Sequence, residues 1–302
     1  MEKHSAFMLT RRLLTALVCV AVAASPVNLA ARAVRDGAGR EVSVPDQAHS
    51  IICLAPNLAE TVYALGLWKE VAGVTDYTDY PPEARLKPHV GGLIDPSLEK
   101  IVFLHPDLVL ADAGINRQQT VEQLEHLHIP VFVVRPQGLE GVLESIREIG
   151  NATGRQTAAA SLVKDLQAKE KQIADRVQGL PRPKVFVLIW YQPVITAGRA
   201  AFVTDVISAA GGRSVTAEIP QAWPQISMER VLQLSPDFLL LVRGGGHGGV
   251  SLAMLRAAPG WRNLQAVRRG RVIYMDDRFF HASPVVFDAL GELAKKLHPS
   301  AF

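Results

Sequence analysis

The phrase Leu98-Glu-Lys-Ile-Val-Phe-Leu-His-Pro-Asp-Leu-Val-Leu110 returns later in the chain as Met228-Glu-Arg-Val-Leu-Gln-Leu-Ser-Pro-Asp-Phe-Leu-Leu240. Both copies have an acidic residue in second place, a basic residue in third place and a Pro-Asp pair before a closing apolar run. A phrase kept over so long a gap predicts two similar lobes. Each lobe would then carry one carboxylate, Glu99 or Glu229, at an equivalent place.

The surrounding sequence alternates short apolar runs with helical patterns. In the first half, strands are expected at 51–54, 71–74, 108–110 and 131–134, and helices at 58–65, 98–104 and 118–127. In the second half, strands are expected at 185–189, 238–242 and 272–274, and helices at 202–210, 228–234, 252–257 and 285–297. This alternation predicts an α/β fold of two similar lobes, each built on a small parallel sheet.

The segment between the two halves predicts a long, rigid helix. Helical spacing of apolar residues runs through 139–178 and is interrupted near 150–154. The predicted divisions are an N-terminal lobe at 34–150, an interlobe helix at 151–181 and a C-terminal lobe at 182–302. Because a helix is stiffer than a Gly/Ser-rich linker, we expect a ligand cleft between lobes that move little.

Residues 1–33 have the features of a signal peptide for export. Arg11-Arg12 precedes an apolar stretch at 13–24, and Ala31-Arg32-Ala33 has the small-x-small pattern of a cleavage site. The paired arginines also fit a twin-arginine signal, although the general export route is favoured.

The two cysteines bear on the compartment and on stability. Cys19 follows the bulky Val18, whereas lipid attachment needs a small residue at that position, so a lipid anchor is not expected. Cys53 alone then remains after cleavage, which excludes an internal disulfide.

The composition is that of a globular protein with room for two domains. The chain has 302 residues, of which 48% are hydrophobic and 20% charged, and its net charge is +3. This weak positive charge comes without a clustered basic run, so nucleic acid is not an expected partner.

Glu99 and Glu229 each open a predicted helix, where the helix dipole favours an anion. Stabilisation of the helix end would explain one such acid by itself. Two acids at matching positions in two lobes are instead typical of a pseudo-symmetric docking surface for basic residues of a partner.

The loops after the predicted strands are rich in aromatic residues. They include the segments 55–57, 76–80, 91–93, 190–193, 222–225 and 277–281. In parallel α/β folds, ligands bind at the carboxyl ends of the strands. Aromatic rings beside Pro and polar residues suit a large, flat, partly polar ligand, and they make Trp190 and Phe279 candidate contacts. Packing inside a lobe is the alternative for Trp190.

His281 is the candidate for contact with a metal centre, since imidazole coordinates iron or cobalt. It has no second ligand nearby in the sequence, so a hydrogen-bonding role is favoured. Asp277 and His281 are the closest approach to an acid–base pair, and the chain contains no recognisable catalytic motif or closed metal-ligand set. We therefore expect no catalytic residue, bound metal or cofactor.

Together these features resemble the periplasmic solute-binding proteins of ABC importers that carry cobalamin, iron-siderophores or haem. The resemblance covers nearly all of the chain after about Asp36. Phrases similar to those of cobalamin-binding members are Gly73-Val-Thr-Asp-Tyr-Thr-Asp-Tyr-Pro-Pro82, Thr196-Ala-Gly198, Trp223-Pro-Gln-Ile-Ser-Met-Glu229 and Ala282-Ser-Pro284.

The resemblance implies roles for five residues. Glu99 and Glu229 match the acids that dock onto arginines of the membrane permease dimer. Tyr77 and Trp223 match aromatic residues that line the corrin cleft from opposite lobes. Asp277 matches an acid that contacts the ligand from the second lobe.

Four further positions in the cleft depart from the cobalamin-binding pattern. Leu93 stands in place of a Trp, Ile195 in place of a Phe and His281 in place of an Arg, while Asn57 replaces a small residue. Fewer aromatic rings would weaken stacking on a corrin, so haem and ferric siderophores stay as alternative ligands.

The resemblance therefore predicts a monomeric periplasmic binding protein, not an enzyme. It would capture cobalamin or a related corrinoid and deliver it to an ABC importer permease with its cytoplasmic ATPase. A secreted tetrapyrrole-modifying enzyme on the same framework is the alternative from another functional class.

Overall fold

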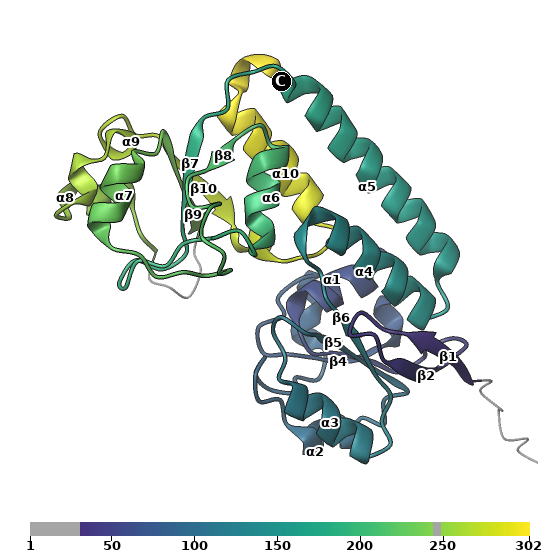
Figure 1. Cartoon of the computed structure of the whole chain (residues 1–302). Helices are drawn as coiled ribbons and strands as arrows, with labels where there is room; N and C mark the ends of the chain where they lie inside the picture. Colours follow the sequence, from purple (N-terminus) through teal and green to yellow (C-terminus); the bar gives the residue numbers. More distant parts are fainter. Residues whose placement is uncertain (1–30, 244–248) are drawn as a thin grey trace, which may run out of the picture.

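The computed structural model describes residues 31–243 and 249–302, which form two α/β lobes joined by a long helix (Figure 1). Each lobe contains one parallel sheet, as the alternating pattern predicted, and each sheet has four strands, of which the strand at Arg213–Ser214 was not predicted. The predicted fold class is thereby confirmed. Residues 1–30, which hold most of the predicted signal peptide and Cys19, lie outside the described residues.

The N-terminal lobe has a sheet of order β4-β3-β5-β6. Its strands are β3 (Ile51–Cys53), β4 (Val71–Val74), β5 (Leu108–Asp112) and β6 (Val131–Val134). Its helices are α1 (Pro56–Ala64), α2 (Leu98–Phe103) and α3 (Gln118–His126), with short 3-10 helices η1 (Trp68–Glu70) and η2 (Pro82–Leu86). An antiparallel hairpin of β1 (Ala31–Arg35) and β2 (Glu41–Pro45) was not predicted.

The C-terminal lobe repeats this plan with a sheet of order β10-β9-β7-β8. Its strands are β7 (Lys184–Leu188), β8 (Arg213–Ser214), β9 (Phe238–Arg243) and β10 (Val272–Asp276). Its helices are α6 (Phe202–Ala209), α7 (Met228–Leu234), α8 (Leu252–Ala257), α9 (Gln265–Arg268) and α10 (Val286–Leu297). Short 3-10 helices are η3 (Trp261–Asn263), η4 (Asp277–Phe280) and η5 (Pro299–Ala301).

The Pro-Asp pair of the repeated phrase has the same structural role in both lobes. The carboxylate of Asp107 accepts hydrogen bonds from the backbone amides of His49 and Ser50, at 2.8 and 3.0 Å, just before β3. The carboxylate of Asp237 accepts one from the amide of Lys184, at 2.8 Å, at the start of β7. Each aspartate therefore ties the start of its own strand to the neighbouring strand, which explains why both copies keep it.

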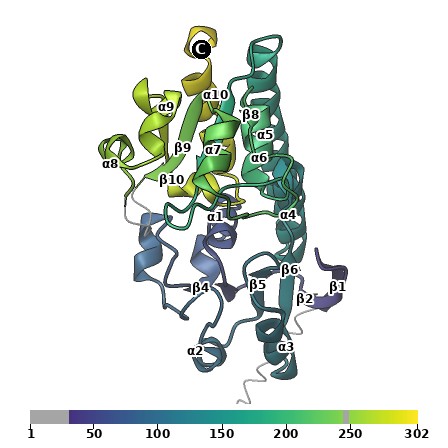
Figure 2. The same ribbon diagram turned by 60° about the vertical axis from the view of Figure 1, so that its left-hand side comes forward.

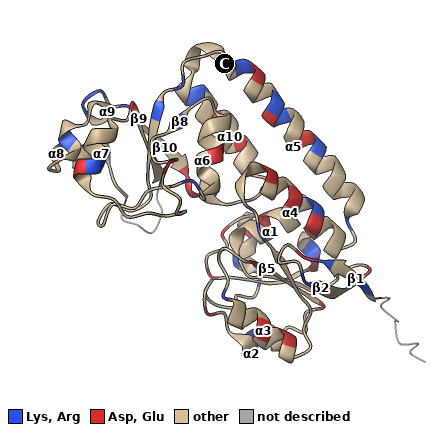
Figure 3. Cartoon of the chain, viewed as in Figure 1, with Lys and Arg blue, Asp and Glu red and all other residues tan. Residues whose placement is uncertain are grey.

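Two consecutive helices connect the lobes. They are α4 (Gly138–Ala152) and α5 (Gln156–Val177), and α5 runs along one side of both lobes (Figure 2) with acidic and basic residues along its length (Figure 3). At 1.5 Å per residue the 22 residues of α5 span about 33 Å. Gly150 permits the close approach of the two helices, because a Cβ atom there would lie only 2.3 Å from that of Ala159.

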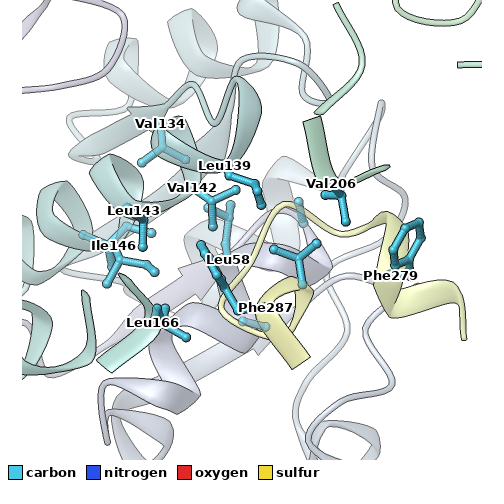
Figure 4. Close-up of a cluster of buried hydrophobic side chains, with 14 of the residues drawn as sticks. Leu58, Val134, Leu139, Val142, Leu143, Ile146, Leu166, Val206, Phe279 and Phe287 are labelled. Carbon is cyan, nitrogen blue, oxygen red and sulfur yellow. The ribbon is translucent and has the colours of Figure 1, made fainter. Parts of the chain in front are cut away.

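A single hydrophobic core extends from one lobe into the other. It contains Leu58 of α1, Val142 of α4, Leu166 of α5, Val206 of α6 and Phe287 of α10 (Figure 4). Buried apolar surface must be exposed to water if these helices separate, at about 25 cal/mol per Å². The lobes are therefore joined by packing as well as by α5.

The start of the hairpin bears on the predicted signal peptide. Cleavage after Ala33 would remove three of the five residues of β1. Among them is Arg32, whose guanidinium donates a hydrogen bond of 2.9 Å to Oδ1 of Asn151. The boundary at residue 33, like the other predicted divisions of the chain, stays a prediction.

Candidate ligand-binding site

A cavity of about 720 Å³ lies between the two lobes. The N-terminal lobe lines it with Pro56, Asn57, Tyr77, Leu93, Asp112, Ala113, Gly114, Ile115, Arg135, Pro136 and Gln137. The C-terminal lobe lines it with Ile189, Ala200, Ala201, Phe202, Ala222, Trp223, Val242, Asp277, Phe280, His281 and Ala282. This volume is typical of pockets that bind drug-sized molecules.

The cavity lies where it does because the strands of both sheets end there. Asp112 ends β5, Arg135 directly follows β6, and Asp277 directly follows β10. In a parallel sheet all strands present their carboxyl ends at one edge, so the loops that follow them meet around a common space. The two sheets face this space from opposite lobes.

Two exposed aromatic residues face the cavity from opposite lobes. Tyr77 of the N-terminal lobe is 65% exposed, and Trp223 of the C-terminal lobe is 47% exposed. Large aromatic residues are normally covered in a folded protein, and covering these would remove apolar surface from water. The walls thus offer flat apolar faces to a ligand.

A buried polar pair forms part of the wall in the N-terminal lobe. Nδ2 of Asn57 donates a hydrogen bond of 2.8 Å to Oδ2 of Asp112, and the amide of Gly114 donates one of 2.7 Å to Oδ1. Burial raises the pKa of Asp112, although the hydrogen bonds from Gly114 and Asn57 oppose that shift. Oδ1 of Asn57 is buried and has no hydrogen-bond partner among the described residues. This wall therefore carries an acceptor that the protein leaves unsatisfied.

A second polar group links the lobes beside the cavity. Glu60, on α1 and only 2% exposed, accepts hydrogen bonds from Nδ1 of His281, at 2.7 Å, and from Oγ of Ser283. Burial lowers the pKa of His281, but the hydrogen bond and charge of Glu60, with the charges of Asp277 and Asp79, raise it overall. The pair is therefore a charge-assisted hydrogen bond between lobes.

Six of the nine predicted ligand contacts line the cavity. They are Asn57, Tyr77, Leu93, Trp223, Asp277 and His281. The structure thus brings together residues from five separate loops of the N-terminal and C-terminal lobes.

The other three predicted contacts lie off the cavity wall. Trp190 and Ile195 pair with each other through backbone hydrogen bonds of 3.0 and 3.2 Å in a turn after β7. Phe279 is fully buried in the hydrophobic core, and its neighbour Phe280 lines the cavity instead. These three residues are therefore not part of the cavity wall. Because η4 turns consecutive side chains in different directions, the sequence alone could not tell which phenylalanine faces the ligand.

Several residues at the site were missed in the sequence, among them Asp112, Arg135, Phe280 and Glu60. Asp112 and Arg135 stand at the ends of predicted strands, so the rule that placed ligands at strand ends could have identified them. Phe280 stood in a recognised loop beside Phe279. Glu60 gave no signal, because it lies inside a helical pattern and meets His281 only in the folded chain.

The charges at the cavity are mixed. Arg135 and His281 line it together with the acids Asp112 and Asp277. Arg278, the one cation of the predicted cleft loops, pairs with Asp276 at 2.8 Å and lies over the ring of Tyr80 rather than on the cavity wall. Among the described residues, no group of three or more His, Cys, Asp or Glu could hold a metal ion.

The paired acids lie away from the cavity, each exposed on its own lobe. Glu99 is on α2 and Glu229 on α7, and Figure 1 shows these helices in separate lobes, away from α5. Ser97 and Ser227 cap the two helices in the same way. Hydrogen bonds from its own backbone amide and from Ser227 lower the pKa of Glu229. The repeated phrase therefore presents a carboxylate in the same local setting twice.

The chain is similar in sequence to known periplasmic binding proteins. A profile described as periplasmic binding protein matches residues 51–279. YvrC of Bacillus subtilis, named an uncharacterized ABC transporter substrate-binding lipoprotein, is 28% identical over 275 residues, which are 88% of this chain and 85% of that protein. The vitamin B12-binding protein of Salmonella typhimurium is 31% identical over 252 residues, which are 82% of this chain and 89% of that protein.

A solved structure with a similar fold is named a heme-binding protein. The periplasmic heme-binding protein RhuT of Roseiflexus sp. RS-1, in its apo form, aligns with a TM-score of 0.76 and 27% identity. The alignment covers 84% of this chain and 100% of that protein. Within the part of this chain that the structure describes, no helix is both long and apolar enough to cross a membrane.

Removal of the Glu60 carboxylate tests the link between the lobes. Glu60→Ala would leave His281 and Ser283 without their acceptor in a buried place, so we expect the free energy of unfolding to fall by about 3 kcal/mol. Glu60→Gln, which keeps the shape and one acceptor, should lose less. Urea denaturation at pH 7 measures both. Glu41→Ala, an exposed acid on β2, is the control, and a Glu60→Ala protein as stable as this control would contradict the buried link.

Proposed function

The chain belongs to the periplasmic binding protein family, and from this premise we propose that it captures cobalamin or a related corrinoid between its lobes for delivery to an ABC importer. Members of this family are binding proteins, so the prediction that the chain is not an enzyme is confirmed. The finer assignment of the ligand is a proposal.

The observation that carries the proposal is the pair of exposed aromatic residues, Tyr77 and Trp223, on opposite walls of one cavity. A flat macrocycle offers apolar surface to aromatic rings on both walls, whereas a compact ion offers none.

The charges of the cavity favour a corrinoid over a ferric siderophore. Siderophore sites commonly use several Arg or Lys side chains, but Arg135 is the one such residue among the described residues that line this cavity. Haem is the second candidate. It is supported by the similarity to RhuT and by the presence of a histidine, His281, on the wall.

Delivery is proposed to involve Glu99 and Glu229. Both carboxylates are exposed, in the same local setting on separate lobes, and their lobes are held together by a common core. A rigid pair of acids suits two basic sites on a permease dimer. In this proposal the binding protein acts as a monomer, and the permease works with its cytoplasmic ATPase.

A periplasmic location follows the same proposal. The relative YvrC is named a lipoprotein, whereas the residue before Cys19 argues against lipid attachment in this chain. Because residues 1–30 are outside the described part, cleavage of a signal peptide without a lipid anchor stays a prediction.

The ligand is tested by visible absorption of the purified protein after incubation with cyanocobalamin, haemin or ferrichrome and removal of free ligand. We expect cyanocobalamin to be retained in equimolar amount. Trp223→Ala should weaken its binding about fivefold, because stacking on one aromatic ring is worth about 1 kcal/mol. Trp190→Ala, a matched tryptophan off the cavity wall, should leave the affinity unchanged.

The outcomes of this test distinguish an error in the proposed ligand from an error in the proposed function. Retention of haemin without the corrinoid would replace cobalamin by haem as the ligand. An equal loss of affinity in both tryptophan variants would contradict the assignment of Trp223, rather than Trp190, to the cavity wall. Retention of none of the three chelates would contradict the proposed function.

The docking role is tested by the double variant Glu99→Ala, Glu229→Ala. We expect cyanocobalamin binding to stay intact while the affinity for the permease complex falls at least about tenfold, since close charge pairs in interfaces couple by about 1.5 kcal/mol or more. The control is Glu41→Ala, Glu218→Ala, which also removes one exposed acid from each lobe. Unchanged uptake by cells that carry the first double variant would refute the docking role.

A further inference from the structure

Phe103 has the most exposed ring of any Phe, Tyr or Trp among the described residues. Its exposed fraction is 79%, compared with 65% for Tyr77 and 47% for Trp223, the two rings of the cavity. Phe103 does not line that cavity, and it belongs to none of the hydrophobic clusters of the described residues. Neither the core nor the ligand site therefore accounts for it.

A single exposed ring is common on protein surfaces, but Phe103 lies beside a residue with a proposed role. Phe103 is the last residue of α2, and Glu99 lies four residues earlier in the same helix. Side chains four residues apart lie on one face of a helix, on adjacent turns. Val102, next to Phe103 in the chain, is 39% exposed. The docking carboxylate of the N-terminal lobe therefore has exposed apolar neighbours on its own helix.

The equivalent helix of the C-terminal lobe differs at this position. The repeated phrase aligns Glu99 with Glu229 and Phe103 with Gln233. Glu229 and Gln233 both lie on α7 and are exposed. The exposed position one turn after the acid is thus aromatic in one lobe and polar in the other. Packing of the framework does not explain this difference, because both positions are on the surface.

A protein that covers Glu99 has to cover Phe103 as well, because the two side chains are neighbours on one short helix. Covering the ring removes apolar surface from water. It also keeps water away from the carboxylate, and a charge pair in a drier place is screened less. Aromatic residues are enriched in protein interfaces. This face of α2 therefore fits a partner with an apolar surface beside a basic residue.

We propose that Phe103 is an apolar anchor of the docking surface, and that it fills an apolar recess beside the basic residue of the permease that pairs with Glu99. This inference rests on the proposed function, because it describes the partner of the same docking acids. It makes the two halves of the docking surface unequal. The N-terminal lobe binds through a carboxylate and a ring, whereas the C-terminal lobe binds through Glu229 beside a polar side chain.

The repeat provides a matched pair of variants, Phe103→Ala and Gln233→Ala, which remove one exposed side chain at the same point of each helix. We expect Phe103→Ala to weaken binding to the purified permease–ATPase complex about tenfold, because the free energy of burying a phenylalanine ring is large enough for that factor. Gln233→Ala should weaken it less than about twofold, as is usual for polar contacts around an anchor. Leu127→Ala, which removes a 50% exposed apolar residue after α3, should have no effect. Circular dichroism verifies that each variant is folded.

Ionic strength distinguishes the ring from the carboxylate. The loss of affinity in Glu99→Ala should shrink as salt is added, because salt screens charges. The loss in Phe103→Ala should persist, because apolar burial is not screened.

The contrary outcomes distinguish the anchor from the proposed function. Wild-type affinity in Phe103→Ala, or an equal loss in Gln233→Ala or Leu127→Ala, would overturn the inference alone. A wild-type dimer that Phe103→Ala abolishes would also overturn it, because a second copy of the chain would then cover the ring. Failure of the wild-type protein to bind the permease–ATPase complex would overturn the proposed delivery, and the inference with it.

Discussion

The hydrophobic core shared by the two lobes is the constraint on which the rest of the structure depends. Helices α1 and α4 contribute to it from one lobe, α6 and α10 from the other, and α5 packs along both. To move the lobes apart, the protein would have to expose this core to water. We therefore expect the cavity to be largely preformed, with both walls in place before a ligand enters.

The same constraint gives meaning to contacts between residues that are distant in sequence. Glu60 and His281 meet at 2.7 Å only because the core holds α1 against the segment after β10. Tyr77 and Trp223 face one cavity for the same reason. The paired acids Glu99 and Glu229 would also keep a fixed distance and orientation. A partner that binds both acids at once requires this.

The two lobes are alike in their framework and different at the cavity. The repeated phrase builds a capped helix, a turn and a strand tied by Asp107 or Asp237 in each lobe. The loops at the strand ends do not repeat: one lobe offers Asn57 and Asp112, the other Asp277 and His281. Repetition of the framework thus places an exposed acid at the same position in each lobe, whereas the residues that line the cavity differ between the lobes.

The sequence alone determined most of the order of helices and strands, the two-lobed α/β plan, the family resemblance and most of the cavity-lining loops, because periodicity and turn residues act over short distances. It could not determine the β1–β2 hairpin or which of Phe279 and Phe280 faces the ligand. It also could not place Trp190 and Ile195 off the wall, or bring Glu60 to His281. Tertiary structure decided these features, because burial and hydrogen bonding between distant residues depend on how the lobes pack.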